Sequence, residues 1–295
     1  MAPHLLKRAN VKRRGMRFGT VGIVGVGLIG GSIGLALRKG ALARRVVGIG
    51  YRRWTLTRAR RLGAIDEATC DLARGVRDAD LVVVCTPVGL IPELVKEAAR
   101  HAPERCVLAD AGSTKLWITR ELARLPAFVP SHPIAGGETR GNDAARGDLF
   151  RGALCVITPG RGTDDRAVST VTGFWRALGM PVVRMTAARH DDILGATSHL
   201  PHVVACALAA ATRPSDLPYV GRGFLDATRI AQGDPALWGD ILLTNRRAVA
   251  DRLEAVRGIC REVEGILRAG DRKRLVRFLR RAKRRREGVR NHVPG

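Results

Sequence analysis

Residues 20–40 decide the fold of this chain, and they read Thr-Val-Gly-Ile-Val-Gly-Val-Gly-Leu-Ile-Gly-Gly-Ser-Ile-Gly-Leu-Ala-Leu-Arg-Lys-Gly. The segment 20–26 is rich in Val and Ile, as expected for a buried strand, and the helical pattern over 32–39 ends at Gly40. The six residues Gly25 to Gly30, which begin at the end of the strand segment, match the pattern G-x-G-x-x-G. A strand, this glycine pattern and a helix in that order are typical of a dinucleotide-binding turn.

Each glycine of the turn has a separate expected role. We expect Gly25 to allow the tight turn, Gly27 to let a pyrophosphate approach the backbone, and Gly30 to let the helix pack closely on the strand. Leu28 and Ile29 lie between them, at the helix N-terminus where phosphates are stabilised. An ordinary glycine-rich turn is the alternative interpretation.

The second predicted strand, 46–49, carries information on the cofactor. About 20 residues after the glycine motif, an acidic residue normally holds the ribose 2′-hydroxyl of NAD. This chain instead reads Gly-Tyr-Arg-Arg over 50–53. Because Arg52 and Arg53 suit a 2′-phosphate, the sequence favours NADP over NAD, unless the pair merely reflects an Arg-rich chain. A third strand over 81–85 ends at Thr86 and Pro87, which we also expect to line the cofactor site.

The rest of the chain predicts two domains. Apolar strands over 106–109, 128–129, 154–158 and 181–185 alternate with helices over 56–62, 90–100 and 165–178, which indicates a parallel sheet covered on both faces. After residue 187 only helical patterns remain, over 190–212, 235–268 and 271–286, and the first is apolar almost all round, as in a buried helix. We expect a basic disordered tail over 1–16, a Rossmann-type domain over 17–186, a helical domain over 187–282 and a basic tail over 283–295.

Composition narrows the possible classes of protein. The chain has 295 residues, a net charge of +24 and 45% hydrophobic residues, with basic residues concentrated at both ends. A basic body suits anionic substrates, and the termini could contact nucleic acid or acidic lipid, or simply be solvated. No run of 18 apolar residues occurs, so we expect no membrane span. Six well-separated cysteines indicate free thiols in the cytoplasm, with Cys85, Cys106, Cys155 and Cys206 in apolar runs.

Candidate site residues follow in four further segments. His132 lies in a Pro- and Gly-punctuated stretch that we expect to be a loop, with Glu138 six residues on. Ser113 follows the carboxyl end of a predicted strand, where open α/β sheets bind ligands. A costly proline inside the long helix lies beside Ser198, His199 and His202. The last segment contains Asp226, Arg229 and Trp238.

These segments, taken in order and spacing with the glycine motif, resemble the prephenate/arogenate dehydrogenases of tyrosine biosynthesis over about residues 19–250. The resemblance implies an NAD(P)-dependent oxidative decarboxylation of prephenate or arogenate: hydride passes to the nicotinamide, a base takes the hydroxyl proton, carbon dioxide departs and the ring becomes aromatic. It implies an α/β Rossmann-type domain followed by an all-α dimerisation domain. Nothing after residue 286 resembles a regulatory ACT domain.

The resemblance also implies roles for individual residues. His132 would be the base, since a neutral imidazole is available near pH 7. Ser113 would orient the same hydroxyl, and Arg229 would clamp a substrate carboxylate. Glu138, Asp226 and His202 would line or gate the pocket, with Ser198 and His199 nearby. Trp238 would reach the pocket of the partner subunit in a homodimer built through residues after about 187.

Several competing interpretations stay open. A β-hydroxyacid or imine reductase also pairs a similar first domain with a helical one, although such enzymes lack a histidine segment of this form. A nucleic-acid-binding protein would explain the basic termini, but aromatic residues form only 4% of the chain. His199 and His202 could be a metal pair, yet no third ligand stands at typical spacing, so we expect no metal. His132 could be a loop histidine hydrogen-bonded to a backbone carbonyl, and Arg229 could be an ordinary surface arginine.

Overall fold

The computed structural model describes residues 18–136 and 141–289. The chain divides into two compact units, and the first comprises residues up to Thr86 together with 90–112 and 122–184. Residues 87–89, 113–121 and 185 onwards form the second unit. The main division therefore falls two residues before the boundary expected after 186, and a segment that includes Ser113 belongs with the helical unit.

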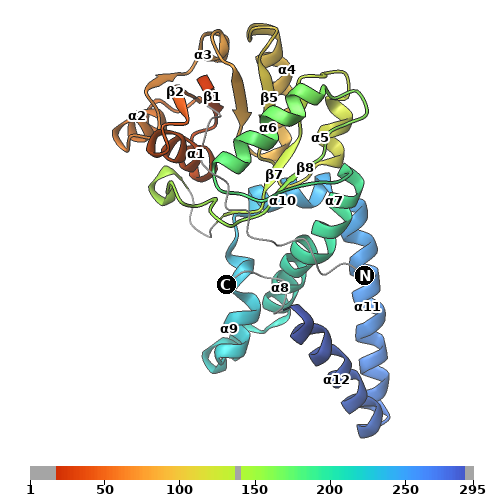
Figure 1. The fold of residues 1–295 in the computed structure, drawn as a ribbon. Coiled ribbons are helices and arrows are strands. Elements are labelled where there is room, and N and C mark those ends of the chain that lie inside the picture. Colours follow the sequence, from red (N-terminus) through yellow and green to blue (C-terminus); the bar gives the residue numbers. More distant parts are fainter. Residues whose placement is uncertain (1–17, 137–140, 290–295) are drawn as a thin grey trace. The chain divides into compact units, whose positions relative to one another are not determined.

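A six-stranded parallel sheet forms the centre of the first unit, with strand order β3-β2-β1-β4-β5-β6 (Figure 1). The strands are β1 (Phe18–Val24), β2 (Ala43–Ile49), β3 (Glu67–Thr69), β4 (Leu81–Val84), β5 (Val107–Asp110) and β6 (Phe128–Val129). The helices between them are α1 (Leu28–Lys39), α2 (Arg53–Arg61), α3 (Leu72–Val76), α4 (Ile91–His101) and, after the sheet, α6 (Asp165–Ala177). β3 and α3 are short and were not anticipated from the sequence.

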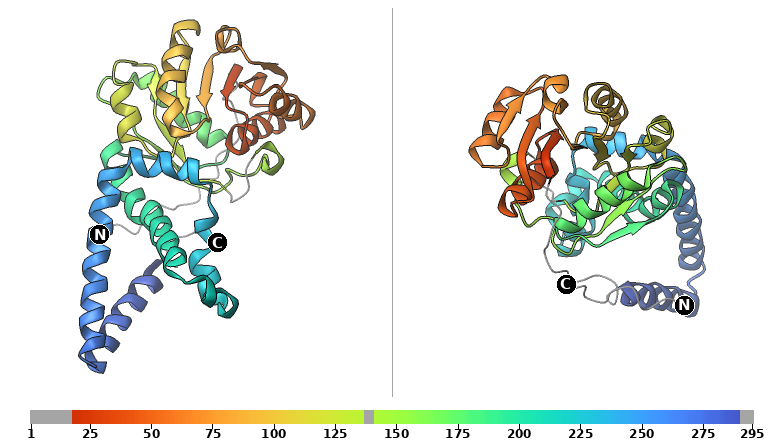
Figure 2. Two further views of the ribbon diagram at one scale, coloured as in Figure 1. Left: turned by 180° about the vertical axis from the view of Figure 1, so that it is seen from behind. Right: turned by 45° about the horizontal axis from the view of Figure 1, so that its top comes forward.

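Helices cover both faces of the central strands of this sheet, and β4 is apolar and buried along its whole length. Val21 and Ile23 of β1 share a core with α1, α2 and α6, where the rings of Phe18 and Phe174 meet edge to face at 5.7 Å. Gly22 of β1 lies on the opposite face, next to α3. A Cβ built on Gly22 would lie 3.8 Å from the carbonyl oxygen of Gly75 in α3. Figure 2 shows α4 from that second face. Burial on both faces explains the lack of hydrophobic alternation in the central strands, whereas the edge strand β3 is largely exposed.

A second, three-stranded sheet corrects the expectation that all strands join the parallel sheet. β7 (Ser131–Pro133) pairs antiparallel with β8 (Cys155–Ile157), which pairs parallel with β9 (Val182–Arg184). Pro130 has no N–H to donate, so pairing with β5 ends at Val129 and the next residues pair with β8. His132 is therefore the central residue of a strand and not a loop residue.

The second unit is helical. Its elements are α5 (Leu116–Glu121), α7 (Ala187–Leu194), α8 (Leu200–Ala211), α9 (Arg222–Thr228), α10 (Pro235–Thr244), α11 (Arg246–Arg268) and α12 (Arg272–Val289), with short turns η4 (Pro214–Tyr219) and η5 (Arg229–Gln232). Because α12 is helical to Val289, the expectation of a disordered tail from 283 is wrong for 283–289. Asp234 caps α10 by accepting a hydrogen bond from the Leu237 N–H, with Pro235 in the first turn.

The long apolar helix is interrupted and only partly buried. A π-helical turn, η3 (Gly195–His199), separates α7 from α8 just before Pro201, whose nitrogen cannot donate to the preceding turn. The helical stretch Ala187–Ala211 is long and apolar enough to cross a membrane by length and composition alone. An 18-residue window within it has a mean hydropathy of 1.4, and 28% of that window is buried. Within a single chain this helix is therefore not buried on all sides, as its apolar pattern had suggested, because Val204 and Leu208 are exposed. His190, Asp191, His199 and His202 are nevertheless buried on its inner side.

Candidate active site

The glycine turn has the geometry that a dinucleotide requires. Gly25 has φ of +89°, and a Cβ there would lie 2.9 Å from the carbonyl oxygen of Cys85. A Cβ on Gly30 would lie 2.1 Å from the carbonyl oxygen of Gly25, so only glycine allows this approach of α1 to β1. Nothing lies within 4 Å of the corresponding position at Gly27, which leaves the backbone open on that side.

The first turn of α1 completes this cradle. The helix begins at Leu28, and no side chain caps its N-terminus at Gly27. The N–H groups of Leu28 and Ile29 are in the first turn, where an α-helix has no internal acceptors and carries partial positive charge. A pyrophosphate would find unpaired backbone donors at these residues, which stay predicted cofactor contacts.

Two arginines follow the carboxyl end of β2. Arg52 is the N-cap of α2 and Arg53 its first residue, and both side chains are exposed. The Arg52 guanidinium lies over the Tyr51 ring, 4.9 Å from its centroid. No acidic residue occurs between Ile49 and Arg53.

A buried hydroxyl faces the same end of the sheet. The Thr86 Oγ1 is buried and has no hydrogen-bond partner among the described residues, which is costly unless a ligand supplies one. Its methyl group would lie 3.0 Å from a Cβ at Gly25, so it adjoins the glycine turn. Burial raises the pKa of the neighbouring Cys85 thiol far above its ordinary value, with Asp110 adding to the effect, so this thiol stays protonated. Pro87 follows and is exposed.

His132 is held by the end of the parallel sheet. Asp110, the last residue of β5, is fully buried, and its carboxylate accepts hydrogen bonds from the backbone N–H groups of Gly112 (2.8 Å) and Ser131 (2.9 Å). His132 pairs with Val156 of β8, and its side chain is half-buried. One buried carboxylate thus fixes the backbone beside the imidazole, a contribution of Asp110 that sequence reasoning missed. Glu138 lies outside the described residues.

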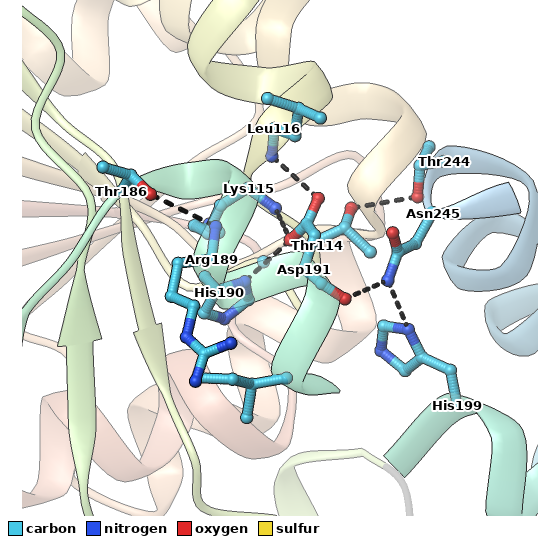
Figure 3. A network of polar contacts seen from close by, with 12 residues as sticks. Thr114, Lys115, Leu116, Thr186, Arg189, His190, Asp191, His199, Thr244 and Asn245 are labelled. Carbon is cyan, nitrogen blue, oxygen red and sulfur yellow. Dashed lines mark hydrogen bonds and ion pairs between the residues drawn. The ribbon is translucent and has the colours of Figure 1, made fainter. Parts of the chain in front are cut away.

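A polar network in the helical unit holds the segment that begins at Ser113 (Figure 3). The Asp191 carboxylate accepts hydrogen bonds from the N–H groups of Lys115 (2.8 Å) and Leu116 (2.9 Å), and His190 Nδ1 lies 2.7 Å from the same carboxylate. Thr114 Oγ1 lies 2.9 Å from Thr244 Oγ1. The network anchors the backbone directly after Ser113 to α7 and α10, with Ser113 itself half-buried.

His199, His202 and Trp238 come together within the helical unit. The Trp238 and His202 rings are stacked with centroids 3.6 Å apart and an interplanar angle of 9°, and His199 meets Trp238 edge to face at 6.3 Å. Within its own chain Trp238 therefore stacks on His202, and its approach to the pocket of a partner subunit stays a prediction. Burial lowers the pKa of His202, while a hydrogen bond to the backbone of Ile230 opposes this effect.

The remaining predicted residues lie on nearby elements. Arg229 opens η5, directly before Ile230, and is exposed, and Asp226 on α9 is exposed as well. Ser198 is half-buried within the π-turn. Sequence reasoning missed Asp191 and Asn245, although a buried His-Asp pair in an otherwise apolar helix is a signal that could have found the first. The described residues contain no cluster of three or more metal-ligating side chains.

A parallel sheet with this glycine cradle at its carboxyl edge indicates an enzyme that binds a dinucleotide. Residues 33–184 match the family model for the nucleotide-binding domain of prephenate dehydrogenase, and residues 186–281 match the model for its dimerization domain. The chain therefore belongs to the prephenate dehydrogenase family, as the sequence resemblance predicted.

Individual relatives agree with this assignment. The chain is 34% identical to prephenate dehydrogenase of Bacillus subtilis, over 92% of this chain and 76% of that protein. It is also 34% identical to cyclohexadienyl dehydrogenase of Zymomonas mobilis, over 80% of this chain and 84% of that protein. The crystal structure of Aquifex aeolicus prephenate dehydrogenase with hydroxyphenyl propionate and NAD⁺ is 31% identical, covers 94% of this chain and all of that one, and gives a TM-score of 0.87. The chain is thus an oxidoreductase of the prephenate/arogenate dehydrogenase type with a nicotinamide cofactor.

Proposed function

We propose that this enzyme carries out the NADP-linked oxidative decarboxylation of prephenate or arogenate with His132 as its base. One observation carries the assignment of the base: the imidazole of His132 stands on β7, whose backbone is tied through Asp110 to the carboxyl end of the cofactor-binding sheet. A base must hold its position relative to the reacting hydroxyl, and a buried carboxylate with two backbone donors provides a rigid support.

Three residues of the chain would have separate roles in the reaction. His132 takes the proton of the substrate hydroxyl, and Ser113 orients that hydroxyl. Arg229 binds a substrate carboxylate with its planar guanidinium. This carboxylate is best the one that remains in the product, because a tight pair to the departing group would oppose its loss of charge. Substrate contacts are also proposed for Glu138, Ser198, His199, His202, Asp226 and Trp238.

The cofactor-binding residues fit NADP. Gly25, Gly27 and Gly30 with the first turn of α1 would hold the pyrophosphate, and Thr86 offers beside them a hydroxyl that no other described residue engages. When bound, the nicotinamide accepts the hydride released from the substrate ring. Arg52 and Arg53 stand where an acid would bind the 2′-hydroxyl of NAD, and their charge suits a 2′-phosphate. Pro87 would complete the edge of this site.

Assembly as a homodimer is supported by the surface of the helical unit. Its segment 186–281 matches a family dimerization domain. Large apolar side chains are exposed there in the single chain, including Val204 (39%), Leu208 (42%) and Leu243 (69%). A second subunit would cover this surface, which also explains why a helix as apolar as 187–211 is only partly buried.

A cytoplasmic location is supported by the thiols. All six cysteines are free: Cys106 and Cys155 are buried, Cys85 and Cys206 are half-buried, and Cys70 and Cys260 are exposed. Exposed free thiols are compatible with a reducing compartment.

Turnover measured on both substrates with both cofactors tests the proposal. We expect a higher kcat/KM with NADP than with NAD, and the Arg52→Ala/Arg53→Ala variant should lose NADP efficiency far more than NAD efficiency. Arg60→Ala/Arg61→Ala is the matched control, since it removes the same charge from exposed positions at the other end of α2. A wild-type preference for NAD would refute the choice of cofactor, and turnover of neither substrate would refute the function.

A further inference from the structure

His199 is the most enclosed of the histidines proposed to contact substrate. Its side chain is 1% exposed, and it ends the π-turn η3. Its Nδ1 lies 3.0 Å from Nδ2 of Asn245, the residue that joins α10 to α11 (Figure 3). Gly195, at the start of the π-turn, packs close to the same segment: a Cβ there would lie 3.1 Å from the Ala248 Cβ and 3.5 Å from the Asn245 amide nitrogen.

The orientation of the Asn245 amide is fixed by a second contact. Its Nδ2 lies 2.8 Å from the backbone carbonyl oxygen of Asp191. A carbonyl oxygen can only accept a hydrogen bond, so the Asn245 atom that faces it must be the amino nitrogen and not the oxygen. That nitrogen has two hydrogens, one for Asp191 and one for His199. Asn245 is therefore the donor to His199, and the His199 Nδ1 must be the unprotonated acceptor.

The Asn245 anchor is itself rigid. Asp191 presents its carbonyl oxygen from α7 while its carboxylate is held by the backbone N–H groups of Lys115 and Leu116. The Asn245 backbone is fixed as well, because its N–H donates to Ile241 and its carbonyl oxygen accepts from Val249. The amide therefore has little freedom to turn and offer its oxygen to the imidazole instead.

We propose that Asn245 is a positioning residue that holds His199 as the neutral Nε2–H tautomer, so that His199 donates a hydrogen bond to an oxygen of the anionic substrate and does not act as a base. The substrate part of this statement rests on the proposed function, whereas the tautomer follows from the contacts of Asn245 alone. A neutral imidazole with Nδ1 engaged and Nε2 protonated has no free lone pair for a proton. Proton abstraction is thereby left to His132, and the two histidines have separate roles.

The electrostatic surroundings agree with a neutral His199. Burial lowers the pKa of His199 to about 4; the negative charge of Asp191 opposes this shift, and His190 and His202 add to it. At the pH of the cytoplasm the imidazole is uncharged, so its Nε2–H remains a donor without change over the working range.

Nuclear magnetic resonance of the ¹⁵N-histidine-labelled protein tests the proposal directly. Long-range ¹H–¹⁵N correlation distinguishes a protonated ring nitrogen from a bare one, and His199→Gln assigns the resonance. We expect a bare Nδ1 and a protonated Nε2 at pH 7 in the wild type. Asn245→Asp exchanges the donor for an acceptor, so His199 should become protonated at Nδ1. A wild-type spectrum with a protonated Nδ1 overturns the proposal even if the variant does not fold.

Asn142→Asp is the matched control. Asn142 is also buried, and its Nδ2 likewise donates to a backbone carbonyl, that of Thr55 at 2.8 Å, but it makes no hydrogen bond to any histidine among the described residues. The same chemical change there should leave the His199 resonances in place. If Asn245→Asp folds and His199 keeps its Nε2–H form, Asn245 does not set the tautomer and the proposal is wrong.

Activity separates this proposal from the proposed function. Titration of the wild type with prephenate or arogenate should shift the His199 Nε2 resonance, and Asn245→Asp should raise KM about tenfold with a smaller change in kcat, as for a lost binding hydrogen bond. If the enzyme turns over neither substrate but His199 shows the expected Nε2–H spectrum, the proposed function is rejected and the proposed tautomer stands. Turnover without any shift of His199 would reject its substrate contact.

Discussion

Lowering the pH is expected to destabilise the protein through His199, and His199→Gln is expected to remove much of that loss. Burial lowers the folded-state pKa of this imidazole to about 4, compared with an ordinary value of 6.5. Below pH 6.5 the unfolded chain therefore binds a proton that the folded chain does not bind. Stability from this group is present above 6.5 and is lost as the pH falls toward the folded-state pKa.

The size of this effect follows from the two pKa values. Between pH 7 and pH 5 the linkage relation gives a loss of about 2 kcal/mol from this one group. Urea unfolding at one fixed protein concentration measures it, since dissociation of a dimer would otherwise shift the apparent stability. Glutamine at position 199 cannot titrate, and His101→Gln, at an exposed histidine of α4, is the control that should keep the wild-type dependence. An unchanged loss of stability in His199→Gln would refute the reasoning.

Substitutions at three further positions test the site. His132→Asn should lower turnover by about 100-fold or more and leave NADP affinity nearly intact, because a general base is lost; turnover near that of the wild type would rule out His132 as the base. Arg229→Ala should raise KM for the substrate and Arg229→Lys should restore only part, since an ammonium cannot form the planar fork; an unchanged KM would place Arg229 outside the site. Asp110→Asn leaves one oxygen for two backbone donors, so kcat should fall with little change in KM, and a variant with wild-type kcat would show that Asp110 does not position His132.

The glycine turn and the strands before and after it could be predicted because their signals are local. Gly25, Gly27 and Gly30 stand at fixed spacing between a strand and a helix, and the structure shows a backbone reason for the first and last. The parallel strands were recognisable as short apolar runs. β3 and α3 were missed because they have three and five residues, too few to show a period.

The elements that the sequence did not reveal depend on distant pairing. β7 looked like a loop because proline and glycine surround His132, and only its pairing with β8 makes it a strand. The bond between Asn245 and Asp191 joins residues 54 positions apart, and no one-dimensional pattern predicts such a contact. The π-turn before Pro201 was foreseen only as a cost to the helix and not as the device that places His199 beside α11.

The stoichiometry of the reaction tests the central claim most directly. The purified enzyme is supplied with NADP⁺ and either prephenate or arogenate, and reduced cofactor and carbon dioxide are quantified in the same reaction. Oxidative decarboxylation predicts equal amounts of the two with at least one substrate, together with an aromatic product. Reduction of the cofactor without release of carbon dioxide would indicate simple alcohol oxidation, as in a hydroxyacid dehydrogenase, and would contradict the proposed function.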